Sequence, residues 1–298
     1  MMTLAALASL ALLSTPAGAD GQQATAKPAA KRKFVRIIND ERNIPLTLQV
    51  ANAHYVRQQK DNIISVDLVG AVHIGDTPYY DNLNKQFRGY DKVLYELIAP
   101  AGTRVESVTT NDKKSLLSRM QLAMTAGLDL SFQLEEVDYT PDNFVHADLS
   151  PAEFKQAMKD AGETPVVMAW RLLSTSIREG ARAALTQGSS TTLRDMMLTG
   201  DNATKVMFAR ELTKTESMQG LLGDDATSSV VGARNARAVE VLVRQIEDGD
   251  TELAIFYGVA HSPDFERRLM DELGFEFAGI TWLDAWDLQS ADKDKSEP

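Results

Sequence analysis

The segment Leu253–Phe275 reads LAIFYGVAHSPDFERRLMDELGF and begins with an apolar run that ends in Gly-Val-Ala-His. A short apolar run bounded by glycine predicts a buried strand, and the Ser-Pro pair after it predicts a helix start. The segment Val66–Tyr90, VDLVGAVHIGDTPYYDNLNKQFRGY, has the same parts in the same order. Strands that alternate with helices predict an α/β fold with a mainly parallel sheet whose faces are covered.

The two segments can be aligned part by part. Each contains Gly-x-x-His, at Gly70–His73 and at Gly258–His261, followed by a hydroxyl residue and a proline. A hydroxyl residue before proline predicts a helix N-cap, here Thr77 and Ser262. In both segments a glycine then ends the helix and a second strand follows. We interpret this as an internal duplication of a strand-helix-strand half.

We expect the α/β domain to span residues 34–289. The polar, basic stretch 20–33 predicts a flexible linker, and the charged stretch 290–298 predicts a frayed tail. The stretch 113–222 is mostly helical in pattern, which predicts a central helical insertion. Strands are expected at 34–40, 44–56, 63–73, 92–98, 253–261 and 277–288, and helices at 77–87, 150–162, 233–246 and 263–273.

The N-terminus reads MMTLAALASLALLSTPAGAD, with an apolar core at Leu4–Leu13 and small residues at Ala17–Ala19. This is the pattern of a signal peptide, residues 1–19, cleaved near Ala19-Asp20. A membrane-spanning helix needs about 20 apolar residues, so this run is too short to span. We expect an exported protein, periplasmic or secreted, without a membrane span after cleavage. The alternative is a disordered apolar leader of a cytoplasmic protein.

Composition restricts the partners and the chemistry. The net charge is −11 and the isoelectric point about 4.9, which argues against nucleic acid or an anionic membrane as the main partner. The chain contains no cysteine. Disulfides, thiolate zinc sites and a cysteine nucleophile are therefore excluded, and any transition metal must be bound by His, Asp or Glu.

Two motif histidines and a glutamate are the main candidates for a site. His73 and His261 are each expected as the last residue of a strand, at the carboxyl rim where α/β sheets bind ligands. Right-handed crossovers bring Glu96, at the end of the strand KVLYE, to the same rim. Two imidazoles and one carboxylate would form an open metal site that leaves a position for water. The alternative is that both histidines are hydrogen-bonded loop residues with an inherited structural role.

Further polar residues permit two interpretations each. The apolar period places Asn235 on the buried side of its helix, where Arg234 could bind a carboxylate or form an ion pair that ties the helix to the sheet. His146 and Asp148 are two positions apart and could add metal ligands, or could belong to a turn before the next helix. His54 is expected to be structural or exposed.

The motifs GAVH and GVAH, the glutamate of LYELI and the Arg-Asn pair before the second motif resemble the TraB/PrgY/GumN family. That family includes the animal TIKI proteins and is distantly similar to the erythromycin-esterase and ChaN-like proteins. The resemblance extends over residues 63–288 and implies an α/β fold of two related halves.

TIKI members are regarded as metal-dependent proteases that use the two motif histidines and the glutamate. The resemblance therefore implies roles for His73, His261 and Glu96, with Arg234 and Asn235 matching the Arg-Asn pair.

From these features we expect an exported metal-dependent hydrolase, specifically a peptidase, that acts on a peptide or small-molecule substrate. Water on a bound Mn, Co or Zn ion would attack the scissile carbonyl. Glu96 would be a ligand or the general base, and Arg234 would orient a substrate carboxylate or the developing oxyanion. One alternative is a non-catalytic protein that sequesters a peptide signal or haem at the same site. Another is a degenerate structural member of the family.

Overall fold

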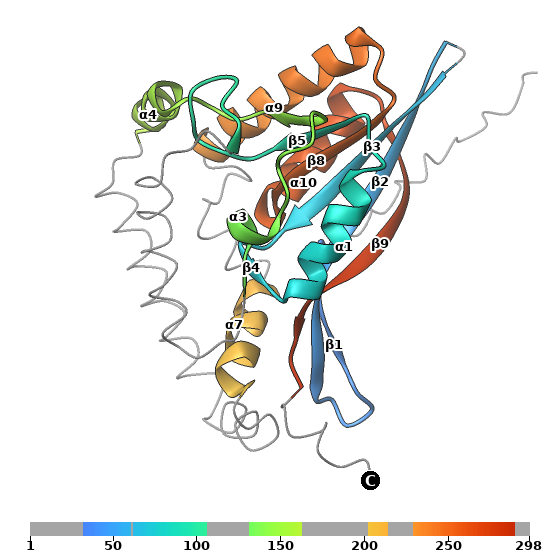
Figure 1. The fold of residues 1–298 in the computed structure, drawn as a ribbon, viewed down its shortest axis with the longest axis vertical. Coiled ribbons are helices and arrows are strands. Elements are labelled where there is room, and N and C mark those ends of the chain that lie inside the picture. The colour runs from blue at the N-terminus through green and yellow to red at the C-terminus, as the bar shows by residue number, and fades with distance from the viewer. Residues whose placement is uncertain (1–31, 61, 106–130, 163–201, 214–228, 290–298) are drawn as a thin grey trace, which may run out of the picture. The chain divides into compact units, whose positions relative to one another are not determined.

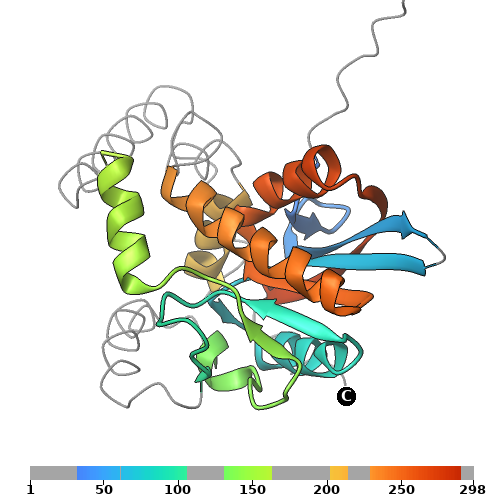
Figure 2. The same cartoon turned by 90° about the horizontal axis from the view of Figure 1, so that it is seen from above.

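The computed structural model describes residues 32–60, 62–105, 131–162, 202–213 and 229–289, and its helices and strands all belong to the unit Lys33–Pro298. Within the described residues, one large mixed sheet carries helices on both faces (Figures 1 and 2). Its strands are β1 (Val35–Asn39), β2 (Pro45–Gln59), β3 (Asn62–Ala71), β5 (Lys92–Tyr95), β7 (Phe144–His146), β8 (Glu252–Gly258) and β9 (Glu276–Asp287). A small second sheet pairs β4 (Ile74–Gly75) with β6 (Ser131–Phe132).

The described helices are α1 (Thr77–Phe87), α3 (Gln133–Glu136), α4 (Pro151–Asp160), α7 (Ala203–Thr213), α9 (Ser229–Asp248) and α10 (Ser262–Arg267). The 3-10 turn η3 (Val259–His261) precedes α10, and the π-helical turn η4 (Arg268–Glu272) follows it. The helices α1 and α4 begin and end within about two residues of the predicted limits. The capping box predicted for α4 is present between Ser150 and Glu153.

The predicted α/β class is confirmed, and the large sheet is mixed. Pairing is parallel from β3 through β8 and β5 to β7, whereas β2 pairs antiparallel with β1, β3 and β9. Only two residues separate the end of β2 from the start of β3, and a connection of that length can only join antiparallel strands. The final strand, β9, runs antiparallel along β2, while β5 lies parallel beside β8. The two repeated segments therefore share strand, turn and helix, and their closing strands occupy different environments.

Alternate residues of the parallel strands pack on opposite faces of the sheet. Val69 and Phe256 belong to a hydrophobic core with α1 and α7, while Leu68 and Ile255 belong to a second core with α9, α10 and η4 (Figure 2). Because both faces are covered, β3 and β8 have continuous apolar sequences instead of alternating ones.

Three sequence predictions need correction in detail. The N-cap of α1 is Asp76 and that of α10 is His261, one residue before the predicted Thr77 and Ser262. The backbone of Ser262 is already helical, since η3 leads directly into α10. The predicted helical block 113–222 also contains β7, an edge strand parallel to β5.

Several predictions fall on residues outside the described ranges. These are the signal peptide, nearly all of the linker, the charged tail, and the parts of the central block at 106–130, 163–201 and 214–228. Among the described helices, none is long and apolar enough to cross a membrane.

The glycine of the first motif, Gly70, has a packing role that can be tested. A Cβ atom added at Gly70 would lie 3.1 Å from both the Ala51 carbonyl oxygen and Val259 Cγ2. We expect Gly70→Ala to lower the free energy of unfolding by about 1–3 kcal/mol, measured by urea denaturation, because the packed strands cannot separate freely. Gly279→Ala is the matched control, since a Cβ there meets nothing within 4 Å. Equal stability of the two variants would contradict this assignment.

Candidate functional site

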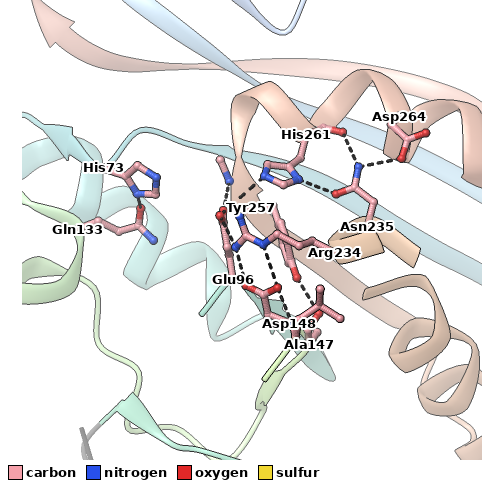
Figure 3. A network of polar contacts seen from close by, with 12 residues as sticks. His73, Glu96, Gln133, Ala147, Asp148, Arg234, Asn235, Tyr257, His261 and Asp264 are labelled. Atoms are coloured by element: carbon pink, nitrogen blue, oxygen red, sulfur yellow. Dashed lines mark hydrogen bonds and ion pairs between the residues drawn. The ribbon is translucent and has the colours of Figure 1, made fainter. Parts of the chain in front are cut away.

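The carboxyl ends of the four parallel strands bring the polar candidates together at one rim (Figure 3). Glu96 directly follows β5, and Asp148 lies two residues after β7. The prediction that each motif histidine is the last residue of its strand is wrong. His73 lies two residues after β3, and His261 ends the η3 turn after β8. His73 lies at a bend between β3 and β4, and His261 lies in the turn that leads directly into α10.

Glu96 is at the centre of the cluster, with both carboxylate oxygens hydrogen-bonded. Its Oε2 accepts from the Gly258 backbone N–H at 2.7 Å, and its Oε1 accepts from Arg234 Nη2 at 2.7 Å. The Nε2 atom of His261 lies 3.7 Å from Oε1. Burial alone would raise the pKa of Glu96, but attraction to His261 once that ring is protonated in acid, and to Arg234 and His73, outweighs burial and lowers the pKa to about 2. The carboxylate is therefore ionised at neutral pH.

Arg234 joins two carboxylates from neighbouring strands. Its Nε donates to Asp148 Oδ1 at 3.0 Å and its Nη2 donates to Asp148 Oδ2 at 2.5 Å, in addition to the bond to Glu96. The Asp148 side chain is fully buried, and the Tyr257 hydroxyl donates to the Ala147 carbonyl at 2.6 Å, which holds the backbone there. Burial alone would lower the pKa of Arg234, but its bonds and charge contacts with the two carboxylates raise it. Of the two interpretations of Arg234, the structure shows the ion pair that ties its helix to the sheet.

Asn235 fixes the orientation of His261. Its Nδ2 donates to Asp264 Oδ2 at 2.9 Å, so its Oδ1 is the atom that faces His261 Nδ1, at 2.5 Å. An amide oxygen only accepts, so His261 carries its proton on Nδ1 and its lone pair on Nε2, toward Glu96. Burial lowers the pKa of His261 and favours this neutral form. The predicted burial of Asn235 is confirmed, at 0% exposed.

His73 is the solvent-exposed member of the cluster and is held by Gln133. Its Nδ1 lies 3.1 Å from Gln133 Oε1, and the Gln133 backbone N–H donates to the His73 carbonyl at 3.0 Å. The hydroxyl groups of Tyr79 and Tyr80 donate to the carbonyls of Gly70 and Val72, which fixes the loop before the histidine. The sequence analysis missed Gln133, because a lone glutamine in a helical pattern carries no signal of a contact 60 positions away.

Gly258 leaves space between the three predicted ligands. A Cβ atom added there would lie 3.3 Å from Glu96 Oε2, 3.9 Å from His73 Nε2 and 3.8 Å from His261 Cδ2. The second motif glycine therefore has a different role from Gly70, since its missing side chain opens the centre of the cluster.

The other two histidines lie apart from this cluster. His146 Nε2 is 2.6 Å from the Leu97 carbonyl oxygen, and the His146 ring packs against Tyr95. His54 on β2 pairs through Nδ1 with Asp67 Oδ1 on β3 at 2.5 Å. The His54 side chain is 43% exposed. Of the pair His146 and Asp148, the structure brings only Asp148 into contact with the cluster, through Arg234.

As they stand, the described residues contain no group of three or more His, Asp or Glu side chains close enough to hold a metal ion. No protein-family model matches the chain, and no curated protein matches it.

Removing the guanidinium at the centre of the cluster should destabilise the protein. Arg234→Met leaves Glu96 and Asp148 as buried, uncompensated carboxylates, so we expect the free energy of unfolding at neutral pH to fall by about 3–5 kcal/mol. The matched control is Arg237→Met on the same helix, whose ion pairs with Glu153 and Glu240 are solvent-exposed and worth at most about 1 kcal/mol. Urea denaturation measures both, and similar losses would contradict the central role of Arg234.

The ionisation of Glu96 predicts a specific acid dependence. Because its pKa falls from 4.5 to about 2 on folding, the carboxylate stabilises the folded state above about pH 4.5, and this contribution is lost as the pH falls toward 2. Glu96→Gln should therefore be less stable than wild type at neutral pH, and the difference should shrink between about pH 5 and about pH 3. Urea denaturation across this range measures the difference. A difference that does not change with pH would contradict the assignment.

Proposed function

We propose that the rim cluster binds one divalent metal ion through His73, His261 and Glu96, and that the protein is a metal-dependent hydrolase. The observation that carries the proposal is the orientation of the two imidazoles (Figure 3). Each Nδ1 faces an amide oxygen. His73 Nε2 borders the space beside Gly258 that Glu96 also borders, and His261 Nε2 faces Glu96 Oε1 at 3.7 Å. A hydrogen bond that fixes Nδ1–H and leaves Nε2 free is the usual support of metal-binding histidines.

The electrostatics of the cluster favour a cation. The Nε2 lone pair of His261 and the Oε1 atom of Glu96 are both acceptors, and they face each other at 3.7 Å. A proton on Nε2 would relieve this contact, but burial disfavours the charged imidazole. Two ligand atoms of a tetrahedral zinc ion lie about 3.4 Å apart, so a small closure of the side chains would suit a bridging ion. In this proposal His73 moves toward the ion, since the residues described by the structure do not bring His73, His261 and Glu96 together as a closed ligand group.

The residues around the ligands would act as positioning residues. A bound ion would lower the pKa of a water molecule and so supply a nucleophile at neutral pH. Arg234 holds Glu96 in place, and Asn235 holds His261. Two of the three guanidinium nitrogens of Arg234 are already bonded to carboxylates, which favours positioning over the expected contact with a substrate carboxylate or oxyanion. If Glu96 is not a ligand, it is the candidate general base.

The resemblance to the TraB/PrgY/GumN family supports the same residues and suggests a peptide as substrate and Mn, Co or Zn as the ion. Export, suggested by residues 1–19, and a duplication of the strand-turn-helix unit are parts of this proposal. The duplication is supported by the equivalent places of His73 and His261 before α1 and α10.

Metal binding is the first test. The untagged full chain, incubated with Mn, Co or Zn and dialysed, should retain about one ion per chain by mass spectrometry. His73→Ala/His261→Ala should lose the ion while remaining folded by circular dichroism. His54→Ala/His146→Ala is the matched control and should retain it, since neither histidine contacts the cluster. Absence of binding to wild type, or equal binding by all three proteins, would contradict the metal site.

Hydrolysis is tested on the loaded protein with a broad peptide library. We expect cleavage by wild type and its loss in Glu96→Gln. A protein that retains the ion and cleaves nothing would contradict the peptidase assignment and support the binding-protein alternative. The haem version of that alternative requires a Soret band on haem titration that is lost when either motif histidine is changed.

A further inference from the structure

We propose that Gln133 is the positioning residue of His73, which fixes the imidazole as the Nδ1–H tautomer and directs Nε2 toward Glu96. This role extends the proposed metal site to a residue that no sequence motif marks. Its effect on metal affinity depends on the proposed function, whereas its effect on the tautomer does not.

Gln133 contacts His73 at two points. The side-chain Oε1 lies 3.1 Å from His73 Nδ1, and the backbone N–H donates to the His73 carbonyl at 3.0 Å. The amide nitrogen is used elsewhere, because Nε2 donates to the Tyr139 hydroxyl at 2.9 Å. In this orientation of the amide the oxygen faces the imidazole, and Nδ1 is the donor.

The opposite tautomer would place two acceptors against each other, because the lone pair on His73 Nδ1 would face Gln133 Oε1 at 3.1 Å. Its Nε2–H group would then donate to solvent and not to Glu96. Both Glu96 oxygens accept from other donors, and within the described residues no hydrogen bond joins them to His73. The Nδ1–H form therefore satisfies both nitrogens, with the lone pair of Nε2 open to solvent or to an ion.

The segment that carries Gln133 is fixed on both sides. Before it, β6 pairs with β4, directly after His73, and the Ser131 and Thr77 hydroxyls lie 3.0 Å apart. After it, Asn84 Nδ2 donates to the Glu136 carbonyl at 2.8 Å. Gln133 itself is only 5% exposed. A buried amide costs free energy unless its hydrogen bonds are made, so the contact with His73 also stabilises this segment.

The two imidazoles differ in how firmly their supporting amides are held. Asn235 is itself bonded to the charged Asp264, and the packing around the buried His261 also restricts its ring. Gln133 is bonded to the neutral Tyr139, and His73 is exposed. An exposed side chain keeps its rotamer freedom unless a hydrogen bond restricts it. His73 should therefore depend more strongly on its amide than His261 does.

The tautomer can be measured on the metal-free full chain by long-range ¹H–¹⁵N correlation of the four histidines, with His73 assigned from His73→Ala. We expect wild type to show Nδ1–H on His73, Gln133→Ala to show a mixture of tautomers, and Gln133→Glu to keep the Nδ1–H form. Gln86→Ala is the matched control, because the side-chain amide of Gln86 donates to the Tyr90 hydroxyl and does not contact the motif histidines. Nε2–H in wild type, or an unchanged tautomer in folded Gln133→Ala, would overturn the proposal.

Metal affinity supplies the second measurement, by competition with a chelating dye for the ion that wild type retains. Gln133→Ala should weaken binding by roughly 10–100-fold, as losses of such supporting contacts typically do, and Gln133→Glu should restore it. If Gln133→Ala fails to fold, Tyr139→Phe provides the test, since it removes only the support of the amide and should weaken binding less. Unchanged affinity in both variants would overturn the role of Gln133. If wild type binds no ion, the proposed function fails, and the tautomer measurement alone decides the role of Gln133.

Discussion

The buried guanidinium of Arg234 is the interaction on which the rim depends. Glu96 follows β5 and Asp148 follows β7, so two carboxylates meet at the end of adjacent parallel strands with little solvent around them. Two buried anions at this separation repel each other strongly unless a fixed cation lies between them. Arginine suits this position because its planar group donates in several directions and keeps its charge when buried. The ion pairs also connect α9 to the sheet, so that packing and electrostatics act on the same contact.

From this charged centre, the site is built with neutral supports. Asn235 and Gln133 contact the two motif histidines through amide oxygens, which orient the rings without adding charge. Arg234 balances only one of the two carboxylates, Glu96 and Asp148, that it contacts, so the cluster keeps a net negative charge. A divalent ion would therefore meet an anionic set of ligands. The arrangement accounts for the burial of polar side chains at a sheet edge where solvent could otherwise hydrate them.

The motif glycines show how one pattern can serve two purposes. Gly70 allows the neighbouring backbone and Val259 to approach, whereas Gly258 keeps the centre of the cluster free of side-chain atoms and donates its N–H to Glu96. Sequence similarity between the two segments predicted that both glycines matter, but could not predict the difference. The difference depends on what each glycine faces. Gly70 faces the backbone of β2, and Gly258 faces the carboxylate of Glu96.

By itself, the sequence determined the α/β class, most helix and strand limits, and the place of His73, Glu96 and His261 near one rim. These follow from local periodicity and from the rule that carboxyl ends of parallel strands share an edge. Only the tertiary structure decided the antiparallel place of β9, the strand β7 that brings Asp148 to the rim, and the contact of Gln133 with His73. Each of these depends on pairing between segments far apart in the chain, and a sequence pattern of period two or 3.6 contains no information about distant partners.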